Sequence, residues 1–537
     1  MGKILDYNKV DLKIIKKLKE IVGDEYVMAE NPPMMYSYMT RGIMGIRASP
    51  PDCVVRPASA KEIAEILKVC TVNKIPITPM ASGLSGGFAL PLLENGGVLL
   101  ECSRMNKIID VNIDARYVIV EPGVRAGEAW AYFKKFHPDW APPIADGAPP
   151  AATIMGDAIE RGFSLVTSRF GPQADMVMGM EIVLPTGEIL RTGSWGLSGV
   201  DEKYQGNKKD GHATPFYKYG LGPDLHSLFF GSQGAMGVVT RLAIKIVPHC
   251  PHKTVLTFGF SNWKDACEAT LKVSKYECGI ADHTVLIQGG NWWIVPTRFQ
   301  KDKIPKTYDY WKTIGVPKYF VNFETWAHSE EELNFVTNMM RHVILEDFAK
   351  EAEDPVTEWK LHPLQIASRL KKPNKIAISY GQWKQGVLFN TWYTPWKDAA
   401  ECMEIYCNKM EEYDFPPAMW FASIDHCREC LIMSIFCFDS RKVTDFERLE
   451  ACETDCTKIF LKKGWMNYRP NPTIHAPLTY AAAPIAYKML RKIKKIIDPN
   501  MIMHPGRLAF IKGIKDPLEI PQFILGFKKS ETVKNHL

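Results

Sequence analysis

Hydrophobic and polar positions follow two different periods along the first half of the chain, which predicts both helices and strands. Apolar residues recur at helical spacing over 9–22 and predict an amphipathic helix. A short apolar run from Cys53 predicts a strand, and Ser59 and Glu62 have the spacing of a capping box that starts a second helix. Two more strands accompany a glycine-rich loop. This succession is typical of an α+β fold that binds a cofactor.

From about His249 the pattern changes to charged, tryptophan-rich segments in which helices and strands alternate. The spacing predicts helices over 329–346 and 397–413. Near the C-terminus it predicts a helix from Pro477, followed by a turn over 498–506. The change at His249 therefore indicates a second region of different architecture.

The composition is that of a globular protein long enough for two to four domains, with 537 residues of which 46% are hydrophobic. The net charge of +6 is mild and no arginine-rich tract is present, so the chain does not resemble a nucleic-acid-binding protein. No stretch reaches the roughly 18 apolar residues of a membrane span, and the N-terminus has no apolar signal segment. We therefore expect a cytoplasmic protein without a membrane span.

The 13 cysteines are odd in number and irregularly spaced, which suits reduced thiols in a cytoplasm. Cys427 and Cys430 form a C-x-x-C motif beside His426, a pattern that also occurs in metal sites. A convincing second motif of this kind is missing from the cysteine-rich stretch Cys402–Cys456. We therefore expect buried or half-buried thiols here and no metal.

Four motifs carry candidate chemistry. The first, Pro79–Gly87, is a glycine- and serine-rich loop whose backbone N–H groups can approach an anionic pyrophosphate. The second, Pro149–Gly162, has small residues that let a flat ring system lie against the backbone, with polar side chains beside it. The third, Phe170–Gly193, predicts a strand, a turn and a second strand, and the fourth, Asp224–Arg241, leads into another strand.

In this order and at these separations, the four motifs resemble the FAD domain of the vanillyl-alcohol oxidase / para-cresol methylhydroxylase family. That family also includes D-lactate and glycolate dehydrogenases. The likeness covers 53–248 and returns at 498–506. It implies an α+β fold in which two subdomains bind FAD and an α+β substrate cap is inserted between them. We therefore predict an FAD-binding domain over 1–248, a substrate cap over 249–463 and a C-terminal return to the FAD domain over 464–537.

The resemblance also implies which residues bind FAD. The pyrophosphate is expected against the glycine-rich loop, and the flavin ring and ribityl chain against the second motif. Two valines of the fourth motif are expected to contact the cofactor. The residues implied in this way are Pro79, Ala81, Ser82, Gly83, Leu84, Ser85, Gly86, Pro149, Thr153, Gly156, Asp157, Val238 and Val239.

The segment Gly464–Arg469 resembles the one with which the phenol-oxidising branch of this family binds its substrate. By that resemblance, Tyr468 and Arg469 bind and stabilise a phenolate. An ionised phenol pushes electrons toward its para carbon, from which hydride leaves for flavin N5. A cation beside the phenolate supports that ionised form.

The chain departs from the phenol oxidisers at three positions. Gly86 stands where they have a tyrosine that also contacts the phenolate, and Pro172 stands where they have an aspartate near flavin N5. Asn390 falls at the position from which a cap His or Tyr is linked covalently to the flavin, with Tyr393 close by. We therefore expect the FAD to be bound non-covalently.

Two further residues are candidates for the catalytic site. Arg169 is a candidate substrate contact. Compared with the family, the chain has two extra residues before Asp175, and these bring Arg169 to a position from which it can point at the substrate. His475 follows Arg469 by six residues and is a candidate base.

The expected function is FAD-dependent dehydrogenation of a para-substituted phenol or related aromatic alcohol, alone or followed by water addition to a quinone methide. A cytochrome or another redox protein would accept the electrons, and the chain would form a homo-oligomer or the flavoprotein subunit of a complex. Two alternatives stay open. One is a 2-hydroxy-acid dehydrogenase, in which Arg469 or Arg169 pairs with the carboxylate. The other is a non-catalytic flavin subunit for electron transfer.

Overall fold

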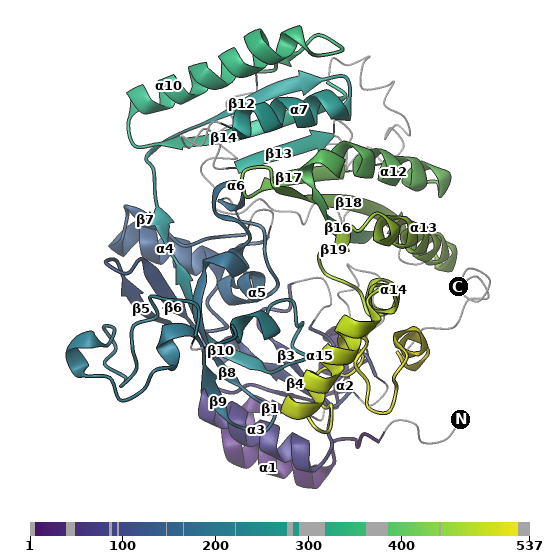
Figure 1. The fold of residues 1–537 in the computed structure, drawn as a ribbon. Coiled ribbons are helices and arrows are strands. Elements are labelled where there is room, and N and C mark those ends of the chain that lie inside the picture. The colour runs from purple at the N-terminus through teal and green to yellow at the C-terminus, as the bar shows by residue number, and fades with distance from the viewer. Residues whose placement is uncertain are drawn as a thin grey trace.

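The computed structural model arranges the chain in an N-terminal region and a cap region, joined on one side by strands and on the other by the C-terminal segment (Figure 1). The N-terminal region runs from purple to teal in Figure 1, the cap lies above it, and the yellow C-terminal segment descends beside the N-terminal region. The residues described are 6–29, 31–38, 49–84, 89–93, 96–145, 148–164, 166–220, 222–275, 283–288, 317–360, 385–415, 417, 419–439 and 442–524.

The first sheet of the N-terminal region has four strands in the order β1-β2-β4-β3, of which β2, β4 and β3 are parallel. Helix α3 begins as predicted, because Ser59 Oγ accepts the Glu62 N–H at 3.2 Å and Glu62 accepts the Ala58 N–H at 2.8 Å. The apolar face of α3 is buried in the core together with that of α1. The elements are α1 (Leu12–Val22), β1 (Val27–Met28), α2 (Pro32–Ser37), β2 (Cys53–Val55), α3 (Ala60–Val72), β3 (Ile77–Met80) and β4 (Val98–Glu101).

The second sheet has five antiparallel strands in the order β5-β6-β10-β8-β9, and every residue of its strand β8 is buried. A two-stranded pair, β7 and β11, stands where the chain leaves for the cap. The elements are β5 (Ile108–Asn112), β6 (Tyr117–Val120), α4 (Ala126–Phe136), β7 (Trp140–Ala141), α5 (Ile154–Ile159), α6 (Thr167–Phe170), β8 (Val177–Val183), β9 (Ile189–Arg191), β10 (Val238–Lys245) and β11 (Val247–Pro248).

The cap contains one antiparallel sheet of eight strands in the order β15-β12-β14-β13-β17-β18-β16-β19. Its helices form a second hydrophobic core with the sheet. Because β19 pairs with β16, the cap sheet ends at Asn467, four residues beyond the predicted boundary at 463. The elements are β12 (His252–Phe260), α7 (Trp263–Ser274), β13 (His283–Gln288), β14 (Tyr319–Ala327), α10 (Glu330–Arg341), β15 (Thr357–Glu358), β16 (Gln385–Pro395), α12 (Ala399–Glu412), β17 (Met419–Ile424), β18 (Glu429–Asp439), α13 (Val443–Lys462) and β19 (Met466–Asn467).

The C-terminal segment contains two helices, α14 (His475–Ala482) and α15 (Pro484–Ile497), where the sequence predicted one. The break follows from Pro484, which has no N–H to continue the helix before it and instead starts the next one. Beyond α15, residues 502–504 run beside β3. The Ile77 N–H donates to Ile502 O at 2.9 Å, and the His504 N–H donates to Ile77 O at 2.8 Å.

A buried ion pair fixes this return to the N-terminal region. Lys494 and Asp498 are both fully buried, and Lys494 Nζ lies 2.5 Å from Asp498 Oδ2. Lys494 also donates to Ala235 O and to Met503 O, and Asp498 accepts the Met503 N–H at 2.9 Å. A buried charge pair is stable only when such additional bonds satisfy it. The pair therefore joins α15, the turn after it and the loop before β10.

We predict that Lys494→Met destabilises the protein, because it leaves the Asp498 carboxylate buried without its cation. The expected loss is about 3–5 kcal/mol in the free energy of unfolding, measured by urea denaturation. Lys495→Met, which changes the exposed next residue of the same helix, is the control and should leave the urea midpoint unchanged. Equal midpoints for the two variants would show that the pair does not hold the return in place.

Candidate flavin and substrate site

The glycine-rich loop follows β3 at the point where residues 502–504 run beside that strand. Gly83 has a φ of +66°, a conformation that favours glycine, and begins the turn of the loop. Pro79 packs so closely on Gly234 that a Cβ there would lie 2.5 Å from Pro79 Cγ. Of the predicted pyrophosphate residues, Pro79 lies in β3, and the loop directly after that strand carries Ala81, Ser82, Gly83 and Leu84, whereas Ser85 and Gly86 lie outside the described residues.

Helix α5 begins directly beside this loop. Thr153 Oγ1 caps the helix by accepting the Gly156 N–H at 3.3 Å, and Pro149 belongs to the turn before it. A Cβ on Gly156 would lie 2.9 Å from Thr153 Oγ1 and 3.8 Å from Ala81 Cβ. The first and second motifs therefore lie against each other, as their expected roles require. Val238 is packed in the core at the start of β10 and Val239 is partly buried beside it, so their contact with FAD stays a prediction.

Tyr468 and Arg469 follow β19 at the junction of the cap and the N-terminal region. The Tyr468 N–H donates to Thr391 O at 2.9 Å, and the Tyr468 ring meets the ring of Tyr393 edge to face at 5.3 Å. Tyr468 also belongs to a small apolar cluster with Phe163 of the N-terminal region and with residues of β17 and β18. Arg469 Nη2 donates to the Tyr468 hydroxyl at 2.8 Å. The sequence prediction that these two residues act as a pair agrees with this geometry.

Because the Tyr468 hydroxyl accepts the hydrogen bond from Arg469, its own proton remains available to a ligand. Burial raises the pKa of Tyr468 to about 12, although the Arg469 charge lowers it, so the hydroxyl is protonated at neutral pH. Burial lowers the pKa of Arg469, but Tyr468, Asp157 and Glu160 raise it, and the net shift is upward. The pair therefore presents an O–H donor and a permanent positive charge in a buried place, which suits an anionic or ionisable oxygen.

Several buried polar atoms around this pair have no hydrogen-bond partner among the described residues. A carboxylate or amide oxygen left in this way costs free energy unless a ligand or water satisfies it. The atoms come from α5, from the loop before β10 and from the return, and they are Asp157 Oδ2, Glu160 Oε2, Gln233 Oε1 and Arg469 Nε. Gln233 connects the group, since its N–H donates to Glu160 Oε1 and its Nε2 donates to Pro470 O.

This arrangement fits FAD. The loop at 79–84 and the start of α5 offer close backbone approach, and the unsatisfied polar atoms offer the donors and acceptors that a flavin ring needs at its polar edge. The predicted roles of Thr153, Gly156 and Asp157 toward the ring, and of Gly83 and its neighbours toward the pyrophosphate, are consistent with this arrangement and stay predictions.

The prediction for Asn390 is wrong in its orientation. Its side chain lies on the helix-facing side of the cap sheet, where Nδ2 contacts Glu453 Oε2, the Tyr406 hydroxyl at 2.9 Å and His475 Nε2 at 3.2 Å. Strand residues alternate between faces, so the side that meets the N-terminal region carries Tyr393 instead. Asn390 therefore does not stand where a residue linked to the flavin has to stand.

The structure also does not support His475 as a base. Its Nδ1 accepts the Asn471 N–H at 3.3 Å, and its Nε2 lies 3.1 Å from Glu453 Oε2. Both ring nitrogens are thus engaged in the buried network around Asn390. Asn467, whose Nδ2 donates to Asn390 Oδ1 at 2.9 Å, joins that network to the segment bearing Tyr468.

Arg169 ends helix α6 as an exposed side chain whose guanidinium lies over the ring of Phe170 at 5.3 Å. A role in binding a buried substrate therefore stays a prediction without support from its position. The sequence reasoning did not name Glu160 and Gln233 among the site residues. Glu160 had a local signal, because it follows Asp157 by three residues at the end of α5. Gln233 is brought in by a distant segment.

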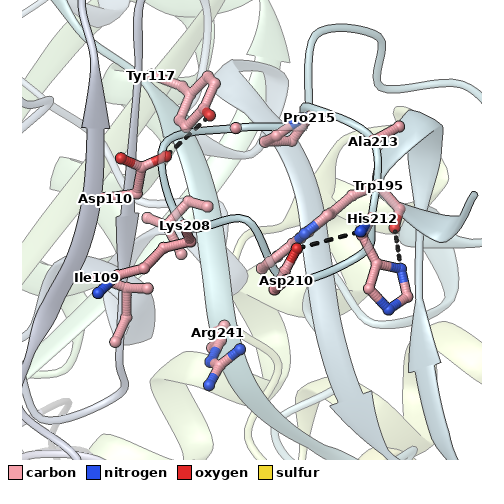
Figure 2. A pocket seen from close by; sticks show the side chains of 12 residues that line it. Ile109, Asp110, Tyr117, Trp195, Lys208, Asp210, His212, Ala213, Pro215 and Arg241 are labelled. Carbon is pink, nitrogen blue, oxygen red and sulfur yellow. Dashed lines mark hydrogen bonds between the residues drawn. The ribbon is translucent and has the colours of Figure 1, made fainter. Parts of the chain in front are cut away.

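A cavity of about 180 Å³ lies on the outer side of the five-stranded sheet, under the loop that follows β9 (Figure 2). Its wall includes Lys208, His212 and Arg241 together with Asp110, whose carboxylate accepts the Tyr117 hydroxyl at 3.0 Å. None of its lining residues belongs to the predicted site. Within the described part of the chain, no group of three or more His, Cys, Asp or Glu side chains is arranged to hold a metal ion.

The helices described here include none that is both long and apolar enough to cross a membrane. The cysteines of the C-x-x-C motif, Cys427 and Cys430, are buried thiols, and burial raises the pKa of each to about 12.

Residues 51–193 match the FAD binding domain family. The chain is 23% identical to the flavoprotein subunit of 4-cresol dehydrogenase [hydroxylating] from Pseudomonas putida, over 92% of this chain and 95% of that protein. It is also 23% identical to a D-lactate dehydrogenase from Anaerostipes hadrus, over 94% and 98%. Among solved structures, 4-ethylphenol oxidase from Gulosibacter chungangensis in complex with isoeugenol superposes with a TM-score of 0.79 at 20% identity, over 94% of this chain and 98% of that one.

The fold and the site together define an FAD-dependent oxidoreductase, and the predicted α+β fold class and cofactor are confirmed. The chain has the fold of p-cresol methylhydroxylase and 4-ethylphenol oxidase, and its residues 51–193 match the FAD binding domain family. Its equal identity to a cresol dehydrogenase and a lactate dehydrogenase does not decide the substrate.

We predict that Gly83→Val abolishes FAD binding, because a branched side chain strains a positive φ and fills the space where the pyrophosphate approaches the backbone. The ratio of flavin to protein absorbance of the purified variant measures this. Gly199→Val is the matched control, since Gly199 has a φ of +70° and no atom within 4 Å of its Cβ position. FAD content equal to the wild type in Gly83→Val would place the pyrophosphate elsewhere.

Proposed function

We propose that the protein is a dehydrogenase of a para-substituted phenol or a related aromatic alcohol. The observation that carries the proposal is the Arg469–Tyr468 hydrogen bond at a buried junction, which leaves one cation and one O–H donor to hold a phenolic oxygen. Bound FAD supplies the hydride acceptor. Two of the similar proteins, a 4-cresol dehydrogenase and a 4-ethylphenol oxidase, are named for phenols, which is consistent with this choice.

The chain's own residues act on the oxygen end of the substrate. Arg469 holds a positive charge at every physiological pH, so it lowers the pKa of a phenol bound beside it. The Tyr468 O–H donates a hydrogen bond to the same oxygen. Tyr393 packs on Tyr468 and keeps its ring in place. The phenolate formed in this way drives electrons toward the para carbon, from which the hydride leaves.

Removal of hydride from a 4-alkylphenolate leaves a neutral quinone methide, to which water can add in a hydroxylation. The electrons pass from the reduced cofactor to an external carrier, for which a cytochrome or another redox protein is our candidate. A cytoplasmic location and a homo-oligomeric or subunit state are part of the same proposal.

One observation favours a second candidate, a 2-hydroxy-acid dehydrogenase. The D-lactate dehydrogenase relative is as similar as the cresol dehydrogenase, and a guanidinium can pair with a carboxylate in two parallel hydrogen bonds. Asp157 and Glu160 argue against this second candidate, because both are buried carboxylates that already interact with the charge of Arg469. A third carboxylate from the substrate would add to that negative charge.

We predict that Arg469→Met slows flavin reduction by a 4-alkylphenol about 10²-fold, or about 2.7 kcal/mol in the barrier, because the phenolate loses its cation. The pH profile of reduction should move toward higher pH for the same reason. Stopped-flow absorbance without oxygen measures both effects, and Arg428→Met, on the exposed surface of the cap, is the control. Wild-type reduction kinetics and an unmoved pH profile in Arg469→Met would remove Arg469 from the site.

We predict that acid precipitation releases the FAD into the supernatant. The face of β16 that meets the N-terminal region offers Tyr393 as the candidate for a covalent link, and burial raises its pKa well above the usual range. The phenolate that such a link requires is therefore disfavoured. Flavin fluorescence that stays with the denatured polypeptide on a gel would contradict this, and its loss in Tyr393→Phe would identify the link.

A further inference from the structure

Asp157, which the sequence places on the cofactor side of the site, is a buried carboxylate whose charge also acts on Tyr468 and Arg469. It lies on α5 directly after Gly156, and its side chain is 8% exposed. Oδ2 has no hydrogen-bond partner among the described residues. Among the described residues, the groups whose charges act with Asp157 are Arg469 and Tyr468, both on the return from the cap, and Glu160 follows directly after the end of α5.

Neither of the other titratable candidates is equally available. Glu160 accepts the Gln233 N–H at 3.1 Å, and Arg161 and Arg507 act on its charge in addition to Arg469. His475 is occupied on both ring nitrogens, as described above. Pro172 stands where the phenol oxidisers carry their aspartate, so the chain has no carboxylate at that position. Among the described residues, Arg469 is the cation that acts on the charge of Asp157.

We propose that Asp157 is the base that accepts the hydroxyl proton of a phenol bound at Tyr468 and Arg469. This inference rests on the proposed function and extends it. The phenol O–H bond breaks, the proton forms a new O–H bond on Asp157 Oδ2, and the electron pair stays on the phenolate oxygen held by Arg469. Hydride then leaves the para side chain. When water adds to the quinone methide, Asp157 returns its proton to the ring oxygen and the remaining proton of the water is released.

The electrostatics of the site agree with this role. Burial raises the pKa of Asp157 to about 6, although the Arg469 charge lowers it. The carboxylate is therefore mostly ionised at neutral pH, yet basic enough to share a proton with a phenol whose own pKa Arg469 lowers. The free enzyme should lose the ability to ionise a phenol as the pH falls through about 6, because Asp157 is then protonated already. A neutral phenol also fits beside two fixed carboxylates better than a carboxylate substrate does.

The test uses the FAD-loaded protein and 4-nitrophenol, a phenol without a para alkyl group that reports its ionisation by its absorbance. Below the probe's own pKa in water, the wild type should bind it as the phenolate. Asp157→Asn should bind it as the neutral phenol and should slow flavin reduction by a 4-alkylphenol about 10²-fold. Asp157→Glu, which keeps the carboxylate, should restore part of both signals. Asp24→Asn, which removes an exposed carboxylate outside the site, is the control and should keep the phenolate spectrum.

Each outcome bears on a definite part of the claim. Phenolate binding in Asp157→Asn as in the wild type overturns the inference and leaves the proposed function intact. Failure of the wild type to bind any phenol overturns the proposed function itself, and the inference with it. Loss of FAD in Asp157→Asn but not in Asp157→Glu assigns the carboxylate to the cofactor and also overturns the inference.

Discussion

A guanidinium that cannot lose its charge, Arg469, is held at the junction of the cap and the N-terminal region, and the rest of the site depends on that constraint. A buried cation is stable only beside groups that balance and hydrogen-bond it. Tyr468 accepts one of its N–H groups, and Asp157 and Glu160 supply the negative charge. These partners come from the cap return and from α5, so the cap and the N-terminal region have to meet here for the charge to be balanced.

Other parts of the fold keep this junction in place. On the cap side, Asn467 is tied to Asn390, and Asn390 to Glu453 and His475, so the strand before Tyr468 is anchored in a buried polar network. Buried hydrogen bonds of this kind rigidify the segments that they join. Beyond the junction, the Lys494–Asp498 pair fixes the return against the loop before β10. The segment with Tyr468 and Arg469 is therefore held at both ends.

Local signals in the sequence predicted much of the fold and part of the site. The capping box at Ser59 and the positive φ at Gly83 depend on a few neighbouring residues, and the family motifs identified the Tyr468–Arg469 pair. The orientation of Asn390 was not predictable, because one position along a strand exchanges its two faces. The contacts of His475 were not predictable either, because Glu453 and Asn390, which lie beside its ring, are 22 and 85 positions away in the sequence. Interactions at such separation exist only once the sheet and helices have packed.

The central claim is that Arg469 and Tyr468 hold a phenolic oxygen. The most direct measurement is flavin absorbance after the purified protein is mixed, without oxygen, with a series of 4-alkylphenols and with D-2-hydroxy acids. The account predicts that a 4-alkylphenol bleaches the flavin and that the hydroxy acids do not. Bleaching by a hydroxy acid, with every phenol inert, would contradict it.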